Sequence, residues 1–174
     1  MSEIHEALGR ELVEAAVLRG DFLLRSGARS SYYIDKYLFT TRPELLRRLA
    51  AELSARVPSG VDRIAGTVLG AIPLATALSL ESGLPMVMIR GEKKDYGTAK
   101  QIEGTLASGE RVLLVEDVVT TAGAALAAVD VLREAGAEVV GVLVVVDREE
   151  GGAAAFEQAG VPYQALFTKT ALGL

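Results

Sequence analysis

The chain has 174 residues, a formal net charge of −5 at pH 7 and no cysteine, and 50% of its residues are hydrophobic although only 5% are aromatic. This composition predicts one domain with a mainly aliphatic core, excludes disulfides and thiolate metal sites, and disfavours a nucleic-acid partner. No stretch reaches the roughly 18 uninterrupted apolar residues of a membrane span, and the charged N-terminus is unlike a secretory signal, so we expect a cytoplasmic protein with no membrane partner.

The N-terminal part of the chain predicts two helices separated by extended segments. Residues 2–18 repeat aliphatic side chains at helical spacing, which indicates an amphipathic helix. A short extended pair is expected over residues 22–25 and 32–36. A second helix should begin at the next turn, because Thr41 and Glu44 have the spacing of a capping box.

Strands and helices alternate in the rest of the chain. A near-continuous run of valines over 138–147 is typical of a central parallel strand. This alternation predicts an α/β fold with a doubly wound, mainly parallel sheet, helices on both faces and functional loops at one edge. Strands are expected over 63–66, 85–90, 112–115, 138–147 and 163–167, and helices over 73–82, 122–135 and 152–159.

The most informative run extends from Arg111 to Leu126. Branched apolar residues predict a strand that ends at Glu116 and Asp117, and a hydroxyl-rich turn then opens an alanine-rich helix. Ligands of open α/β sheets bind at the carboxyl ends of strands, where amides of a helix start suit a phosphate and carboxylates suit sugar hydroxyls or a hydrated metal ion. The alternative is an ordinary corner in which both carboxylates are solvated and Thr121 caps the helix.

Two further loops should converge on the same edge. Residues 66–73 contain two glycines that permit close approach of the backbone to a ligand, although glycines at such a turn often serve the turn alone. Residues 90–104 form a long polar segment in which an otherwise acidic chain concentrates positive charge. Such a loop suits a departing pyrophosphate and can close over a site, and the alternative is a solvated charged loop.

Two segments have the chemistry to recognise a flat acidic base. Residues 147–152 carry Arg148, whose planar guanidinium suits a carboxylate unless it pairs with a neighbouring acid at the surface. Residues 24–36 combine basic and hydroxyl side chains with Tyr32 and Tyr33. These tyrosines either stack on a heterocycle or occupy the two faces of a strand.

The run after Arg111 resembles the 5-phosphoribosyl pyrophosphate (PRPP) signature of the type I phosphoribosyltransferases: an apolar strand, two acidic residues, two apolar residues and a threonine-rich turn containing glycine. The Arg-Ser-Gly turn before Tyr32, the Lys-Lys-Asp-Tyr-Gly run and residues 147–152 narrow the resemblance to the orotate phosphoribosyltransferases, over nearly the whole chain. The resemblance implies one domain over residues 1–174, with residues 1–40 forming a small N-terminal hood over the base site.

The resemblance also implies Mg²⁺-dependent transfer of the 5-phosphoribosyl group from PRPP to orotate in pyrimidine biosynthesis, by a homodimer whose 90–104 loop reaches the partner's site. The resemblance assigns catalytic roles to Lys94, Glu116 and Asp117. It implies no direct strong ligand for the metal ion, and Glu116 and Asp117 would contact that ion through water. Orotate contacts fall on Tyr33, Ile34, Thr120 and Arg148. PRPP contacts fall on Arg25, Arg90, Lys94, Tyr96, Glu116, Asp117, Val118, Val119, Thr120, Thr121, Ala122, Gly123 and Ala124. Arg25 and Tyr96 depart from the lysine and histidine common in the family.

Three other functions stay open. A phosphoribosyltransferase for a purine or another pyrimidine would leave Arg148 without a carboxylate to bind. A PRPP-sensing regulator that binds nucleic acid would need a binding segment, and no helix-turn-helix is visible. A dinucleotide-binding enzyme would need a G-x-G-x-x-G run after its first strand, which this chain lacks. We expect His5, the sole histidine, to be structural.

Overall fold

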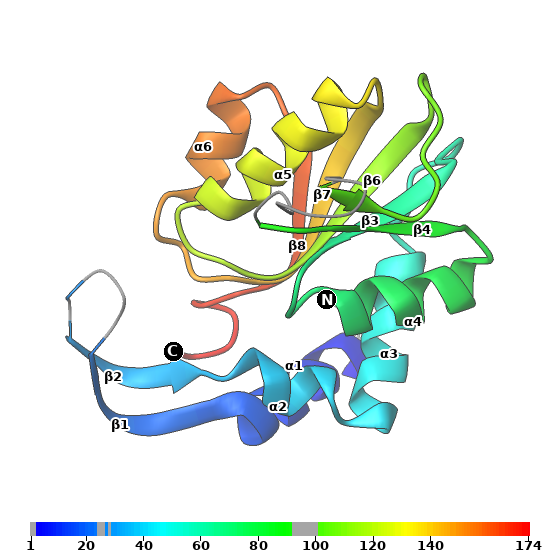
Figure 1. The fold of residues 1–174 in the computed structure, drawn as a ribbon. Helices are drawn as coiled ribbons and strands as arrows, with labels where there is room; N and C mark the ends of the chain where they lie inside the picture. The colour runs from blue at the N-terminus through cyan, green and yellow to red at the C-terminus, as the bar shows by residue number, and fades with distance from the viewer. Residues whose placement is uncertain (1–2, 24–26, 28, 92–100) are drawn as a thin grey trace.

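The computed structural model describes residues 3–23, 27, 29–91 and 101–174. It contains a six-stranded sheet with the strand order β5-β4-β3-β6-β7-β8 and a separate two-stranded sheet, β1-β2 (Figure 1). In chain order the elements are α1 (Glu3–Ala16), β1 (Val17–Leu23), β2 (Arg29–Ile34), α2 (Lys36–Thr40), α3 (Pro43–Ser54), β3 (Arg63–Thr67), α4 (Ile72–Ser82), β4 (Met86–Ile89), β5 (Ile102–Glu103), β6 (Arg111–Val119), α5 (Gly123–Glu134), β7 (Glu138–Asp147), α6 (Gly152–Gln158) and β8 (Tyr163–Thr168).

The large sheet lies between two layers of helices, as the sequence predicts (Figure 1). Strands β4, β3, β6, β7 and β8 pair in parallel, and the short β5 adds an antiparallel edge. Successive residues of β6 point to opposite faces, so Val112 and Leu114 pack with α5 and α6 while Leu113 and Val115 pack with α1, α3 and α4. The doubly wound α/β architecture is therefore confirmed. None of the helices in the described part of the chain is long and apolar enough to cross a membrane.

The two-stranded sheet extends beyond α1 and α2 in Figure 1. Its antiparallel register runs from the pair Val17 and Ile34 to the pair Leu23 and Arg29. Helix α1, in contrast, belongs to the main body, because its Leu8 and Leu12 are fully buried in the core against the large sheet. The hood over the base site expected for residues 1–40 stays a prediction.

Several local predictions differ from the structure. The extended pair expected over residues 22–25 and 32–36 is formed by residues 17–23 and 29–34, so residues 17–18, expected in the first helix, pair in β1 instead. The capping box expected at the start of α3 does not form: Arg42 is the N-cap without a side-chain bond, while the Thr41 hydroxyl donates to the Tyr37 carbonyl 2.5 Å away. The unexpected short helix α2 ends at Thr40 with Thr41 as its C-cap, and the Thr41 hydroxyl bonds back to the last turn of that helix. Strand β6 also continues past the acidic pair to Val119, because β7 extends its pairing as far as Asp147.

Candidate active site at the carboxyl edge of the sheet

Glu116 and Asp117 lie near the carboxyl end of β6 and are both buried, with 7% and 2% of their surface exposed. The parallel neighbour β3 ends at Thr67, whose hydroxyl lies 2.8 and 2.9 Å from the two carboxylate oxygens of Glu116 and donates to them. The alternative of an ordinary strand–helix corner with both carboxylates in solvent is therefore wrong. They are held inside the protein by specific partners.

Asp117 is paired with a residue that sequence reasoning missed. Lys36, the first residue of α2, places its Nζ 3.1 Å from Asp117 Oδ2. The amide of Val118 donates to the other carboxylate oxygen, Oδ1, at 2.6 Å. The lysine lies far from the acidic pair in the chain, and no local pattern signals that α2 starts beside the end of β6.

Burial dominates the electrostatics of the acidic pair. It raises the pKa of Glu116 to about 7, with a further upward contribution from the Asp117 charge and a partial correction by the Thr67 hydroxyl. Burial likewise raises the pKa of Asp117, against the opposing effect of Lys36. For Lys36 burial is the largest single effect and lowers the pKa, but the charge and hydrogen bond of Asp117 together with the charge of Glu116 outweigh it and leave the lysine pKa raised. The ligand-free site thus holds carboxylates that gain from a nearby cation or hydrogen-bond donor.

The turn between β6 and α5 has the geometry of an anion cradle. Ala122 is the N-cap of α5 in the left-handed conformation (φ 65°), and no side chain caps the helix, which excludes the reading of Thr121 as a cap. The first amides of α5 consequently have no partner within the helix. They face a hollow of about 320 Å³ lined by Lys36 and residues 116–125. This hollow contains the residues expected to hold a phosphate.

A second hollow of about 460 Å³ adjoins the first. Lys36, Glu116 and Ala124 line both. Its other side is formed by the loop after β3, which contains a cis peptide bond between Val68 and Leu69, and by Arg90 just beyond β4. Arg90 Nη1 lies 3.6 Å from Glu103 Oε1. The other basic residues expected to reach PRPP, Arg25 and Lys94, and the phenol of Tyr96, lie outside the described residues.

The loop that carries Arg148 is attached directly to the motif turn. The Arg148 amide donates to the Val119 carbonyl at 2.9 Å. Asp147 fixes the loop from the other side, accepting from the Tyr163 hydroxyl and from the Glu149 amide, each at 2.7 Å. The loop after β7 and the turn after β6 are therefore positioned as one unit.

Arg148 packs against Tyr32 rather than Tyr33. Its Cζ lies 5.4 Å from the centre of the Tyr32 ring, and its Nη2 lies 2.9 Å from Glu150 Oε1. Arg148 Nε and the Tyr32 hydroxyl are buried and have no hydrogen-bond partner among the described residues. Tyr33 is 43% exposed and packs near Phe22, while Ile34 is buried in the core. Adjacent residues on a strand face opposite sides, so sequence alone did not decide which tyrosine meets the arginine.

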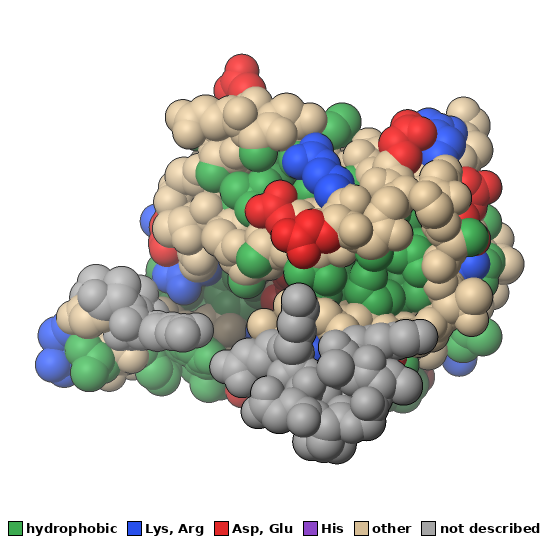
Figure 2. Space-filling model, turned by 45° about the horizontal axis from the view of Figure 1, so that its top comes forward, with side chains coloured by type: hydrophobic (Ala, Val, Ile, Leu, Met, Phe, Trp, Pro, Cys, Tyr) green, Lys and Arg blue, Asp and Glu red, His purple; other side chains and the backbone are tan. Residues whose placement is uncertain are grey.

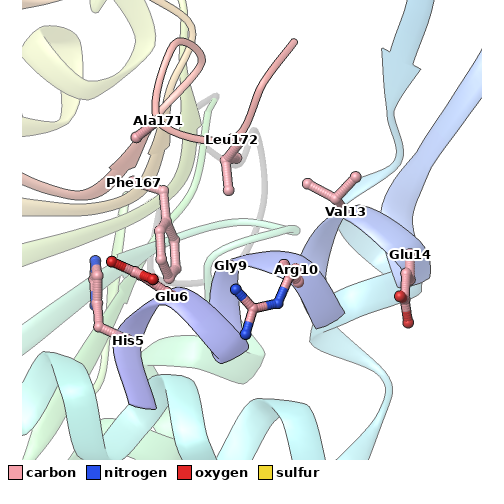
Figure 3. Close-up of a pocket in the computed structure, with 9 residues that line it drawn as sticks. All are labelled: His5, Glu6, Gly9, Arg10, Val13, Glu14, Phe167, Ala171 and Leu172. Atoms are coloured by element: carbon pink, nitrogen blue, oxygen red, sulfur yellow. The ribbon is translucent and has the colours of Figure 1, made fainter. Parts of the chain in front are cut away.

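A third hollow, between α1 and the C-terminal segment, shares no lining residue with these two (Figure 3). In it the ring of His5 stacks on Phe167 with centroids 4.5 Å apart, and His5 Nδ1 lies 3.2 Å from Glu52 Oε2. These contacts are the structural role expected of this histidine.

On the face seen in Figure 2, acidic and basic side chains are interspersed among hydrophobic ones.

Comparisons with known proteins agree with this geometry. The family described as phosphoribosyl transferase domain matches residues 40–155. An orotate phosphoribosyltransferase of Methanocella arvoryzae is 48% identical over 167 residues, which cover 93% of this chain and 95% of that protein. The solved orotate phosphoribosyltransferase of Aeropyrum pernix is 35% identical with a TM-score of 0.83 and 95% coverage of both chains. That of Mycobacterium tuberculosis in complex with PRPP is 34% identical with a TM-score of 0.81, covering 98% of this chain and 99% of that one. The chain therefore belongs to the phosphoribosyltransferase family, and within it to the orotate phosphoribosyltransferases.

Proposed function

We propose that this protein transfers the 5-phosphoribosyl group of PRPP to N1 of orotate, giving orotidine 5′-phosphate and pyrophosphate in pyrimidine biosynthesis. The observation that carries the proposal is the hydrogen bond between the Arg148 amide and the Val119 carbonyl. This backbone bond holds the loop that carries Arg148 beside the turn after β6. The guanidinium of Arg148 suits a carboxylate, and the amides of the turn suit a phosphate. Orotate has a carboxylate and PRPP a 5′-phosphate, and the names of the similar proteins support the same pair of substrates.

Each part of the site has a role in this reaction. The amides of residues 122–125 and the hydroxyls of Thr120 and Thr121 bind the 5′-phosphate, and the paired carboxylates bind the ribose hydroxyls. Substitution at an anomeric carbon passes through an oxocarbenium-like transition state, so nearby carboxylates and stabilisation of the leaving pyrophosphate both lower its energy. We assign the pyrophosphate to Arg90, and to Arg25, Lys94 and Tyr96 as the sequence predicts.

The site fits Mg²⁺ only as an ion that the substrate holds. No group of three potential metal-binding side chains exists in the described part of the chain. Glu116 and Asp117 supply hard oxygen donors, but Glu116 already accepts from Thr67 and Asp117 is already ion-paired with Lys36. Mg²⁺ keeps several waters and uses few protein carboxylates, so we propose that the pair contacts it through water. When bound, the ion neutralises charge on the pyrophosphate.

Two further features are proposals that follow from the family. We propose a homodimer in which the 90–104 loop of one subunit completes the site of the other. We also propose a cytoplasmic location, as expected for a step of pyrimidine biosynthesis.

The test follows the absorbance of orotate when PRPP and MgCl₂ are added, with adenine, guanine and uracil as parallel acceptors. We expect turnover of orotate only. Arg148→Ala should raise the KM for orotate far more than that for PRPP, whereas Arg47→Ala, exposed on α3, should change neither. Turnover of another base without orotate, or equal effects of Arg148→Ala on both substrates, would refute the assignment.

A further inference from the structure

Lys36 occupies the boundary between the two hollows of the site. It lines the phosphate cradle formed by residues 116–125 and also the hollow formed by the loop after β3. The start of α2 fixes its position, because the Asp35 side chain accepts from the Tyr37 amide at 3.0 Å and caps the helix. The residue is therefore held at the site by local backbone structure.

The stem of Lys36 passes through space that a side chain at position 70 would fill. A Cβ added to Gly70 would lie 2.8 Å from Lys36 Cε and 1.8 Å from Asp117 Oδ2. The glycine leaves room for the lysine, the aspartate and the contact between them. Because residue 70 has no side chain, the Lys36 stem can pass this point and bring its ammonium to Asp117.

The ammonium of Lys36 has donor capacity left. Its Nζ lies 3.1 Å from Asp117 Oδ2, and an ammonium has three N–H donors. The lysine side chain is 37% exposed while that of Asp117 is only 2% exposed, and another neighbour of the ammonium is the Tyr37 ring, whose centroid lies 5.7 Å from Nζ, so the ammonium is accessible to a ligand. Among the described residues that line the two hollows, Lys36 and Arg90 carry the positive charges, and Lys36 alone lines the cradle.

We propose that Lys36 is a PRPP-binding residue: its ammonium donates to an oxygen of the donor substrate between the 5′-phosphate and the pyrophosphate, while it still contacts Asp117. The proposal rests on the proposed function for the identity of the ligand. PRPP carries phosphate groups on both sides of its ribose and would span the two hollows, so a cation at their boundary lies beside it. A charge-assisted bond of this kind contributes about a tenfold to hundredfold gain in affinity.

The first experiment measures PRPP binding by calorimetry in MgCl₂ for wild type and Lys36→Met, with Arg47→Met on the exposed side of α3 as a charge-matched control. Methionine keeps the length of the stem and removes the charge. We expect the Kd for PRPP to rise about tenfold to hundredfold for Lys36→Met and to stay unchanged for the control. An unchanged Kd for Lys36→Met would overturn the proposal.

A double-mutant cycle separates contact with PRPP from mere positioning of Asp117. Asp117→Asn removes the partner charge, and Lys36→Met with Asp117→Asn leaves neither member of this ion pair as an unpaired charge, so the double variant also serves if Lys36→Met alone does not fold. We expect the double variant to bind PRPP at least about fivefold more weakly than Asp117→Asn. Equal affinity of the two would show that Lys36 acts only through Asp117 and would overturn the assignment.

Calorimetry with PRPP does not depend on the acceptor. Failure of the proposed function would appear as absence of orotate turnover in the wild type, whatever the effect at Lys36. Failure of the Lys36 proposal would appear as unchanged PRPP binding in an enzyme that converts orotate. The two outcomes are therefore distinguishable.

Discussion

Replacing Glu116 by Gln should stabilise the ligand-free protein, and the gain should grow with pH. Burial raises the pKa of this carboxyl from 4.5 to about 7 in the folded protein. The folded protein therefore binds the proton more tightly than the unfolded chain does, so the free energy of unfolding falls as pH rises through this interval. Glutamine stays neutral, and its amide oxygen can still accept from the Thr67 hydroxyl.

The magnitude follows from the two pKa values of Glu116. The pKa is 4.5 in the unfolded chain and about 7 in the folded protein. Once the carboxyl is ionised in both states, this difference lowers the free energy of unfolding by roughly 3 kcal/mol. Between pH 5.5 and pH 8.5, ionisation of Glu116 should lower the wild-type free energy of unfolding by about 2 kcal/mol of this amount. In a domain of this size 1 kcal/mol shifts Tm by about 2–4 °C, so the advantage of the variant over wild type should grow by roughly 4–8 °C.

Thermal melts of wild type and Glu116→Gln in EDTA, without substrate, at pH 5.5, 7 and 8.5 test this prediction. Glu157→Gln, on the exposed side of α6, should show no comparable trend with pH. The same Glu116 substitution should lower turnover at every pH, because a neutral amide no longer supports the ribose and the metal ion. A melting difference between wild type and Glu116→Gln that is independent of pH would refute the reasoning.

Two further predictions concern the loop that carries Arg148. Gly152→Ala should lower the free energy of unfolding by about 1–3 kcal/mol and raise the KM for PRPP, because its Cβ would lie 2.5 Å from Val119 Cγ1; unchanged melting would contradict this close packing. Tyr32→Leu should raise the KM for orotate about two- to thirtyfold without changing that for PRPP, because it removes the ring that packs on Arg148. A larger effect of Tyr33→Leu would instead support the orotate contact predicted from the sequence.

Patterns confined to short stretches predicted most of the fold. The valine run of β7 and the apolar run of β6 indicated buried parallel strands, and the alternation of strands with helices predicted the doubly wound sheet. Boundaries were less predictable because they depend on neighbours. Strand β6 continues through the acidic pair only because β7 goes on pairing with it.

The chemical groups available at the site follow from short stretches of sequence: the acidic pair, the amide-rich turn and the arginine after β7 are each recognisable from their neighbours in the chain. The partners of these groups depend on the folded arrangement of the chain. Lys36 meets Asp117, Thr67 meets Glu116 and Tyr32 meets Arg148. Each contact joins residues distant in sequence, and its existence depends on how separate elements dock and on which face of a strand is buried. Local propensity and spacing contain no information about either, so these contacts become visible only once the chain is folded.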